Sequence, residues 1–357
     1  MKTKTIRLQF NPYTYVRSAV MRSMLLDKEA YETLIKMGPE EMITYLQARG
    51  YAELAQLRVQ YQGIELVEQA VKQNIVNTFR KLRRISDDDL RTVLDIYLKR
   101  YDVRNIKTVL RGLMFNQPVL SWIIPAGRYP LEFYEEMLKK KDIKEALAML
   151  RGESFEFLAK VYEEGKKNEF EKTNVLFYLE TKLDQEYYQY VFEQAKKVKN
   201  DAGIIKEFMQ EEIRAKNIIT LFKIKKMKKS GDTALFSSLK ENNFFLPHTE
   251  DNLFNHLLKL QTEEAIIAAL RKSHYKTKLD EGIAAYQQTG SLIQLEKNLR
   301  IALLERRKRS AFQNLLSVEV ILNYLFEKDH EGKNIIMLYK AKVLGFPESV
   351  IKQQLIA

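Results

Sequence analysis

The sequence contains no cysteine, and only 13 of its 357 residues are glycine and 7 are proline. The absence of cysteine excludes disulfides and thiolate metal sites, and it fits a reducing compartment such as the cytoplasm. The long stretches between the few glycines and prolines are dominated by leucine, lysine, glutamate, alanine, glutamine and arginine, which favour helix over strand. We therefore predict a nearly all-helical protein.

Long hydrophobic runs are also missing, although 45% of the residues are hydrophobic, which is enough for a sizeable core. The most apolar run, Val119 to Ala126, is too short to cross a bilayer, and Met1 to Phe10 lack the apolar core of a signal peptide. Any association with a membrane is therefore expected to be peripheral.

The sequence motifs of common nucleotide and metal sites are absent as well. No G-x-x-x-x-G-K-[ST] or G-x-G-x-x-G pattern occurs, which argues against nucleotide binding. The four histidines do not have the spacing of a metal site: His248, His256, His274 and His330. We predict no catalytic residue, no metal ligand and no cofactor.

Charge is plentiful and unbalanced, with a net charge of +12. Most helical stretches mix acids and bases, as an ordinary solvated helix face does. Two clusters differ: Ile213 to Ser230 contains seven basic residues and no acid, and Arg306 to Arg309 is an unbroken basic run. Each cluster fits either solvated surface or the binding of an anionic partner.

One pattern occurs three times: a glutamate followed about 37 residues later by Asn-Ile. The asparagines stand 112 and 117 residues apart, and a period of this length indicates a repeated domain. We predict three tandem helical repeats, at residues 1–115, 116–230 and 231–357. The pairs are Glu68 with Asn105, Glu180 with Asn217, and Glu296 with Asn334.

Each pair is predicted to lie on a helical hairpin. In the first copy, helices from about Glu65 to Leu82 and from Asp87 to Met114, with Ser86 and Asp89 as a capping pair, would set the glutamate level with the asparagine. Turns near Asn200-Asp201 and Ser317 give the same arrangement in the other copies. Shorter helical stretches are expected before the hairpins, at Tyr31 to Gly50, Phe133 to Gly152 and Phe254 to Arg271.

Apolar residues follow each asparagine at offsets of one, four and five, so the asparagine shares the apolar face of its helix. A buried amide needs hydrogen-bonding partners, and a carboxylate at the same level supplies acceptors. We therefore predict a buried Glu–Asn contact in each copy, which holds the helices in register.

Basic residues stand one position before and six positions after every asparagine. Seven residues apart, they lie on one side of the helix, away from its apolar face. These basic positions fit either solvated surface or a partner interface. They are Arg104, Arg111, Lys216, Lys223, Lys333 and Lys340.

The run from Tyr101 to Gly112, the turn Ile124-Pro125-Ala126-Gly127 and the threefold repetition together resemble the C subunit of V/A-type ATP synthases, the relative of the d subunit in eukaryotic vacuolar ATPases. The likeness extends over the full length. It implies three helical bundles around a pseudo-threefold axis, shaped like a funnel. It also implies a non-catalytic rotor part at the cytoplasmic face of the membrane, which joins the central shaft to the cytoplasmic loops of the proteolipid ring and transmits torque.

This chain is more basic than that resemblance leads us to expect, which leaves open a contact with lipid headgroups. The resemblance gives no reason to expect nucleic acid as a partner. The alternative is a basic helical-repeat scaffold that binds nucleic acid or an acidic protein.

Overall fold

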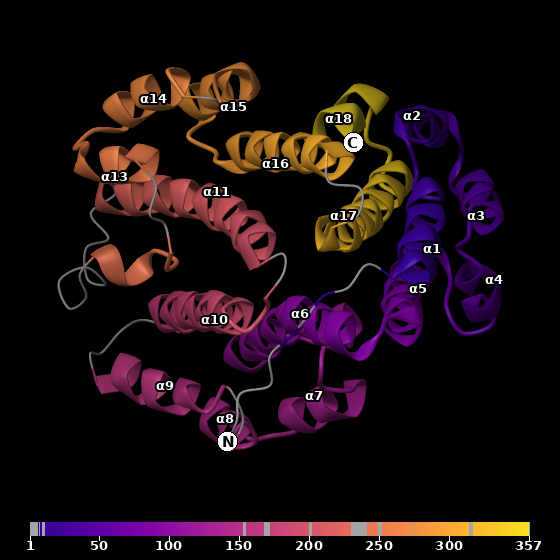
Figure 1. Ribbon diagram of the computed structural model, residues 1–357, viewed down its shortest axis with the longest axis horizontal. Helices are drawn as coiled ribbons and strands as arrows, with labels where there is room; N and C mark the ends of the chain where they lie inside the picture. Colours follow the sequence, from indigo (N-terminus) through magenta and orange to yellow (C-terminus); the bar gives the residue numbers. More distant parts are fainter. Residues whose placement is uncertain are drawn as a thin grey trace. The chain divides into compact units, whose positions relative to one another are not determined.

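The computed structural model describes residues 6, 8, 11–152, 155–167, 172–199, 202–229, 241–248, 252–273, 275–313 and 317–356. Every regular element in these residues is a helix (Figure 1), which confirms the predicted all-α class. Three features of the sequence lie outside the described residues: the Asn200-Asp201 turn, the boundary at Ser230 and His274.

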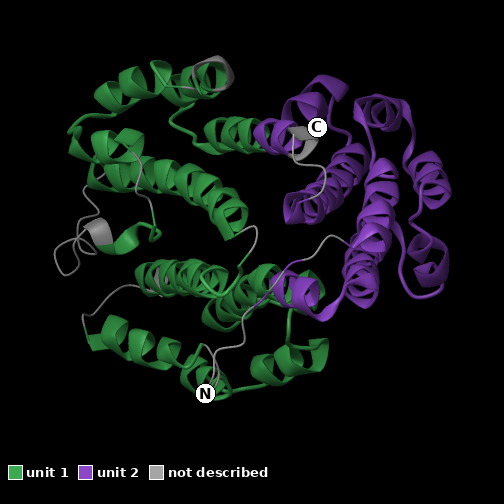
Figure 2. Ribbon diagram, in the orientation of Figure 1, with its two compact units in different colours: residues 1–5, 95–303 green, residues 6–94, 304–357 purple. Residues whose placement is uncertain are grey.

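The chain forms two compact units (Figure 2). Of the described residues, unit 1 contains 95–303, and unit 2 contains 6–94 together with 304–356. The division falls inside two long helices, α6 (Asp88–Phe115) and α16 (Ile293–Gln313). Unit 2 is therefore built from both ends of the chain. The division into three repeats stays a prediction.

Unit 2 contains the N-terminal and C-terminal helices. Helix α17 packs along α5 and also contacts α1 and α3, while α18 packs on α2 and α4 on α5. Its helices are α1 (Pro12–Ser23), α2 (Lys28–Lys36), α3 (Pro39–Ala48), α4 (Glu53–Leu57), α5 (Gly63–Ile85), α17 (Val318–Val343) and α18 (Glu348–Gln354).

Unit 1 contains most of α6 and α16 and the helices between them. Helix α10 packs against α9 and α11, and α14 packs against α15. The helices are η1 (Leu120–Trp122), α7 (Leu131–Leu138), α8 (Ile143–Ala148), α9 (Phe157–Lys167), α10 (Lys172–Ala195), α11 (Ala202–Lys229), η2 (Glu241–Phe244), α13 (Asn252–Lys259), α14 (Glu263–Arg271) and α15 (Lys276–Thr289).

Short polar side chains start several of these helices. Asp27 accepts a hydrogen bond from the backbone N–H of Ala30 at the start of α2, and Ser317 accepts one from Glu319 at the start of α17. Asp87 caps α6 by accepting from the N–H of Leu90 at 2.8 Å. The predicted Ser86–Asp89 capping pair is thus wrong, because the Ser86 hydroxyl donates back to Leu82 O at the end of α5.

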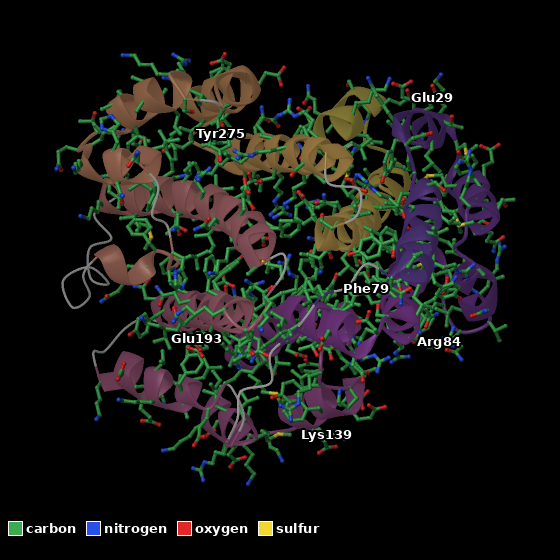
Figure 3. The ribbon with its side chains drawn as sticks, in the orientation of Figure 1. Glu29, Phe79, Arg84, Lys139, Glu193 and Tyr275 are labelled. Atoms are coloured by element: carbon green, nitrogen blue, oxygen red, sulfur yellow. The ribbon has the colours of Figure 1, made fainter. Side chains whose placement is uncertain are left out.

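The core of unit 2 lies where α5 and α17 cross. A Cβ atom at Gly332 of α17 would lie 2.7 Å from Ile75 Cδ1 and 3.0 Å from Val71 Cγ1, so the missing side chain allows the close approach. Buried side chains fill this unit, and Figure 3 shows the labelled Phe79 among them, with Glu29 and Arg84 at its outside. The α5–α17 contact joins residues far apart in the sequence.

A second close approach occurs in unit 1. A Cβ atom at Gly282 of α15 would lie 2.8 Å from Leu295 Cα and 3.1 Å from Gln294 O, both of which are backbone atoms of α16. Backbone cannot rotate away as a side-chain end can, so any side chain at this position requires the two helices to shift apart.

We expect Gly282→Ala to lower the free energy of unfolding by about 1–3 kcal/mol, because the added methyl group forces α15 and α16 apart. Urea denaturation followed by circular dichroism measures the change. Gly203→Ala in the first turn of α11 is the matched control, since a Cβ atom there meets no atom within 4 Å. Equal stability of the two variants would contradict this account of α15 and α16.

Candidate functional site

The three asparagines of the repeat form the same contact. Each carboxamide makes two hydrogen bonds with the backbone of one residue that follows its helix, donating from Nδ2 to the carbonyl oxygen and accepting at Oδ1 from the N–H. The distances are 2.8 and 3.0 Å for Asn105 with Ile124, 3.1 and 2.8 Å for Asn217 with Leu246, and 2.6 and 3.2 Å for Asn334 with Ile356. We call these contacts the asparagine clamps.

The clamps are buried: the exposed fractions of the three asparagines are 0%, 0% and 4%. A carboxamide carries one acceptor and one donor group side by side, and it therefore satisfies the N–H and the C=O of a single residue in an irregular segment. Backbone groups buried without such partners would cost free energy. Each clamp thus holds a segment without regular structure against a long helix.

Asp102, one turn before Asn105, strengthens the first clamp. Its carboxylate accepts hydrogen bonds from the N–H of Arg128 at 3.0 Å, the N–H of Tyr129 at 3.2 Å and the hydroxyl of Tyr134 at 2.9 Å. Burial raises the pKa of Asp102, although these hydrogen bonds oppose the rise. The carboxylate lies against Gly127, where a Cβ atom would approach Oδ1 to 2.3 Å.

Glu331 stands at the same offset before Asn334, and it joins the two ends of the chain within unit 2. It accepts from the N–H of Leu26 at 2.5 Å, the hydroxyl of Tyr51 at 2.6 Å and the ammonium of Lys328 at 2.8 Å. Lys328 also lies over the Tyr51 ring, 4.3 Å from its centroid. Burial and the Glu331 charge both raise the pKa of Tyr51. The middle copy differs, with Arg214 at the equivalent position.

The predicted Glu–Asn contacts are wrong, because the glutamates bind cations. Glu180 receives two hydrogen bonds from Arg111, at 2.6 and 2.8 Å, and Glu68 pairs with Lys340. Arg111 and Lys340 are the basic positions six residues after Asn105 and Asn334. Each of these glutamates therefore faces a long helix of another copy, α6 for Glu180 and α17 for Glu68. The asparagines bind backbone groups and not the glutamates.

The third glutamate departs from this arrangement. Glu296 pairs with Arg300, one turn later on its own helix, and Lys223 is exposed. Among the other basic positions, Lys216 lies 3.9 Å from Glu212 and Lys333 lies 2.5 Å from Asp329. Acids of the fold therefore balance much of the charge at these positions.

The repeat pattern did not reveal a partly buried polar network that links α6, α10 and α11. Arg100 donates to Glu212 at 3.2 Å and to the Tyr187 hydroxyl at 3.2 Å, and the Tyr188 hydroxyl donates to Glu212 at 2.8 Å. Although burial acts to lower the pKa of Arg100, the Glu212 charge raises it overall. A signal was present, since Arg100 and Glu212 each stand five residues before their asparagines and carry opposite charges.

A second, partly buried pair lies beside this network. Lys107 Nζ lies 2.7 Å from Asp184 Oδ1. Burial lowers the pKa of Lys107, and the neighbouring Asp184 opposes the change. For Asp184, burial acts to raise the pKa, but Lys107 and Lys216 together lower it below its usual value. The two neighbouring lysines thus favour the ionised carboxylate of Asp184.

Only some of the residues in the two basic clusters are exposed to solvent. Arg307, within the run from Arg306 to Arg309, is buried with its guanidinium 3.9 Å from the centroid of the Phe326 ring. At the end of α11, Lys226 donates to Gly290 O at 2.8 Å, while Lys228 and Lys229 are exposed.

Among the described residues, no helix combines the length and the apolar character that crossing a membrane requires. In the same part of the chain, acidic and histidine side chains do not gather in groups of three that would suit a metal ion.

Comparison with known proteins gives a match over nearly the whole chain. Residues 15–354 match the family model of the ATP synthase (C/AC39) subunit. Proteins named as the C subunit of A-type ATP synthases are similar to this chain. The protein from Methanosarcina mazei is 30% identical over 356 residues, covering 96% of this chain and 92% of its own. The protein from Methanosarcina barkeri is 30% identical, covering 97% and 92%, and that from Haloferax volcanii is 28% identical, covering 97% of each chain.

The clamps and the glutamates should differ in their contribution to stability. We expect Asn105→Leu to lower the free energy of unfolding by about 2–4 kcal/mol, because it leaves the N–H and C=O of Ile124 buried without partners. Glu180→Gln should cost about 1 kcal/mol or less, since its arginine is half exposed. Urea denaturation compares the two variants. A larger loss for Glu180→Gln would refute the assignment of the structural role to the asparagines.

Proposed function

The chain belongs to the ATP synthase (C/AC39) subunit family, and we therefore propose that it is a non-catalytic rotor subunit of a V/A-type ATP synthase. In this role it connects the central shaft to the membrane proteolipid ring at the cytoplasmic face of the membrane and transmits torque between them. Its three copies surround a pseudo-threefold axis as a funnel.

The observation that carries the proposal is the extent of the match. The family model covers residues 15–354, and relatives named as the C subunit of A-type ATP synthases align over 92% or more of their own length. The whole chain, rather than one shared domain, is thus available for the same role. The recurrence of the asparagine clamp at matching positions of α6, α11 and α17 supports the threefold arrangement.

A part that transmits torque must resist shear between its own helices. The ion pairs Arg111–Glu180 and Lys340–Glu68 each join the long helices of two different copies. The first is bidentate, which fixes orientation as well as distance. The clamps add a second kind of link, from each long helix to the segment that follows it. These links suit a connector, which needs stiffness rather than a nucleophile, an acid or a base.

The two ends of such a connector carry different interfaces. We expect a large, partly apolar interface with the shaft and a polar interface with the cytoplasmic loops of the ring. The basic positions Arg104, Lys216 and Lys333 are exposed, and in this proposal they face the ring or the lipid headgroups around it. Salt should then weaken attachment to the ring more than attachment to the shaft, since screening acts on exposed charges.

The test is a detergent-solubilised pull-down with the full chain as bait, followed by mass spectrometry. We expect shaft and proteolipid subunits to be recovered together at moderate salt, and the proteolipid to be lost first as salt rises. Recovery of nucleic acid or of an unrelated acidic protein instead would support the scaffold alternative and overturn the proposal.

Charge reversal tests the basic positions within the same assay. We expect the combined variant Arg104→Glu, Lys216→Glu and Lys333→Glu to retain about a tenth or less of the proteolipid, because three attractive contacts become repulsive. Reversal of three exposed lysines at other positions, Lys36, Lys81 and Lys160, is the matched control and should retain it. Equal retention by both variants would mean that the basic positions are solvated surface.

A further inference from the structure

Helix α1 has its polar side buried and its apolar side exposed. Thr14 and Ser18 are completely buried, and Tyr15 is nearly so. The exposed fractions of Tyr13, Val16, Val20 and Met24 are 59%, 61%, 47% and 66%, which are high values for such side chains. We call these four residues the α1 stripe. Burial of the polar face and exposure of the apolar one is the reverse of an ordinary surface helix.

The buried face of α1 is firmly held in unit 2. The Thr14 hydroxyl donates to Ile85 O at the end of α5, at 2.5 Å, while the Ser18 hydroxyl is satisfied within α1 by donating to Thr14 O at 2.7 Å. Arg22 donates two hydrogen bonds of 2.7 Å to Glu327 on α17. The helix is thus fixed in its orientation by directional polar contacts, and the exposure of the α1 stripe follows from that orientation.

The spacing of the α1 stripe indicates what covers it. Its residues follow one another at intervals of three, four and four, and at about 100° per residue they lie within an arc of roughly 80° along about 16 Å of helix. So narrow a seam is the contact surface of one helix with another. Helices that lie in a membrane surface present a broader apolar face. The geometry therefore favours a partner helix over a lipid surface.

The charge of α1 indicates a second property of the partner helix. Helix α1 contains no acidic residue, and Arg17, which is exposed, stands one residue after Val16 of the stripe. We propose that the α1 stripe is the docking surface for an amphipathic helix of another protein, whose apolar side chains pack on Val16 and Val20 and whose acidic side chains lie beside Arg17. The identity of the partner rests on the proposed function: this helix belongs to a subunit of the central shaft.

The absence of cysteine in the sequence makes the test direct. Single variants Val16→Cys and Val20→Cys are reacted with a maleimide, in the free full-length chain and in the complex reconstituted with the shaft subunits. Val59→Cys is the matched control, because Val59 is also in unit 2, is 93% exposed and follows α4 rather than standing on α1. We expect the labelling rates at positions 16 and 20 to fall at least about tenfold on assembly, since a covered thiol is inaccessible to the reagent. The rate at position 59 should not change.

Each other outcome overturns the proposal in a recognisable way. Slow labelling in the free chain at every concentration would mean that the rest of the chain covers the stripe, and slow labelling only at high concentration would mean that a second copy does. Protection by vesicles of phosphatidylcholine and phosphatidylglycerol, without protection by the shaft, would assign the stripe to lipid. Unchanged labelling in a complex that does form would refute this inference and leave the proposed function intact, whereas no complex at all would refute the proposed function.

Affinity provides an independent measurement. We expect Val16→Asp with Val20→Asp to weaken binding to the shaft subunits at least about tenfold, through loss of apolar contact and repulsion by the acidic flank. Val59→Asp should leave the affinity unchanged. Circular dichroism checks that the variants fold, which they should, because the substituted side chains are exposed. Unaltered affinity in the double variant would contradict the proposal.

Discussion

The pairing of a buried carboxamide with one residue of backbone organises the three long helices that carry it. Each irregular segment that follows α6, α11 or α17 must bury peptide groups, and an asparagine on the helix satisfies both the donor and the acceptor of one residue at once. The acids Asp102 and Glu331, each one turn earlier, extend the same principle to further N–H groups and to tyrosine hydroxyls. Directional polar contacts thus decide where the connecting segments lie, and apolar packing fills the space between them.

Several features of the fold could be predicted from the sequence. The helical class, the long helices around the first asparagine and the burial of all three asparagines follow from composition and from the spacing of apolar residues, which are local properties. The partners of the asparagines did not follow. A carboxamide on an apolar face needs hydrogen bonds, but periodicity does not distinguish a facing carboxylate from a passing backbone segment 19 to 29 residues away. The error at Glu180 has the same origin, because its arginine lies 69 residues earlier on the helix of another copy.

Equivalent residues of the three copies do not all make equivalent contacts. Two glutamates bind the basic residue that follows another copy's asparagine, whereas Glu296 binds its own helix. Arg100 and Glu212, which occupy equivalent positions of two copies, bind each other. Equivalent positions have therefore acquired opposite charges, a relation that one sequence can suggest only when its internal copies are compared position by position.

Unit 2 takes its helices from both ends of the chain, and this has a consequence for biosynthesis. Helices α1 to α5 leave the ribosome before α17, which contacts α1, α3 and α5 and is translated about 230 residues after α5. Until then the face of α5 that packs on α17 has no native cover, and a chain that stops before α17 never acquires it. Unit 2 can therefore be completed only after α17 has been synthesised, although most of its other helices are made much earlier.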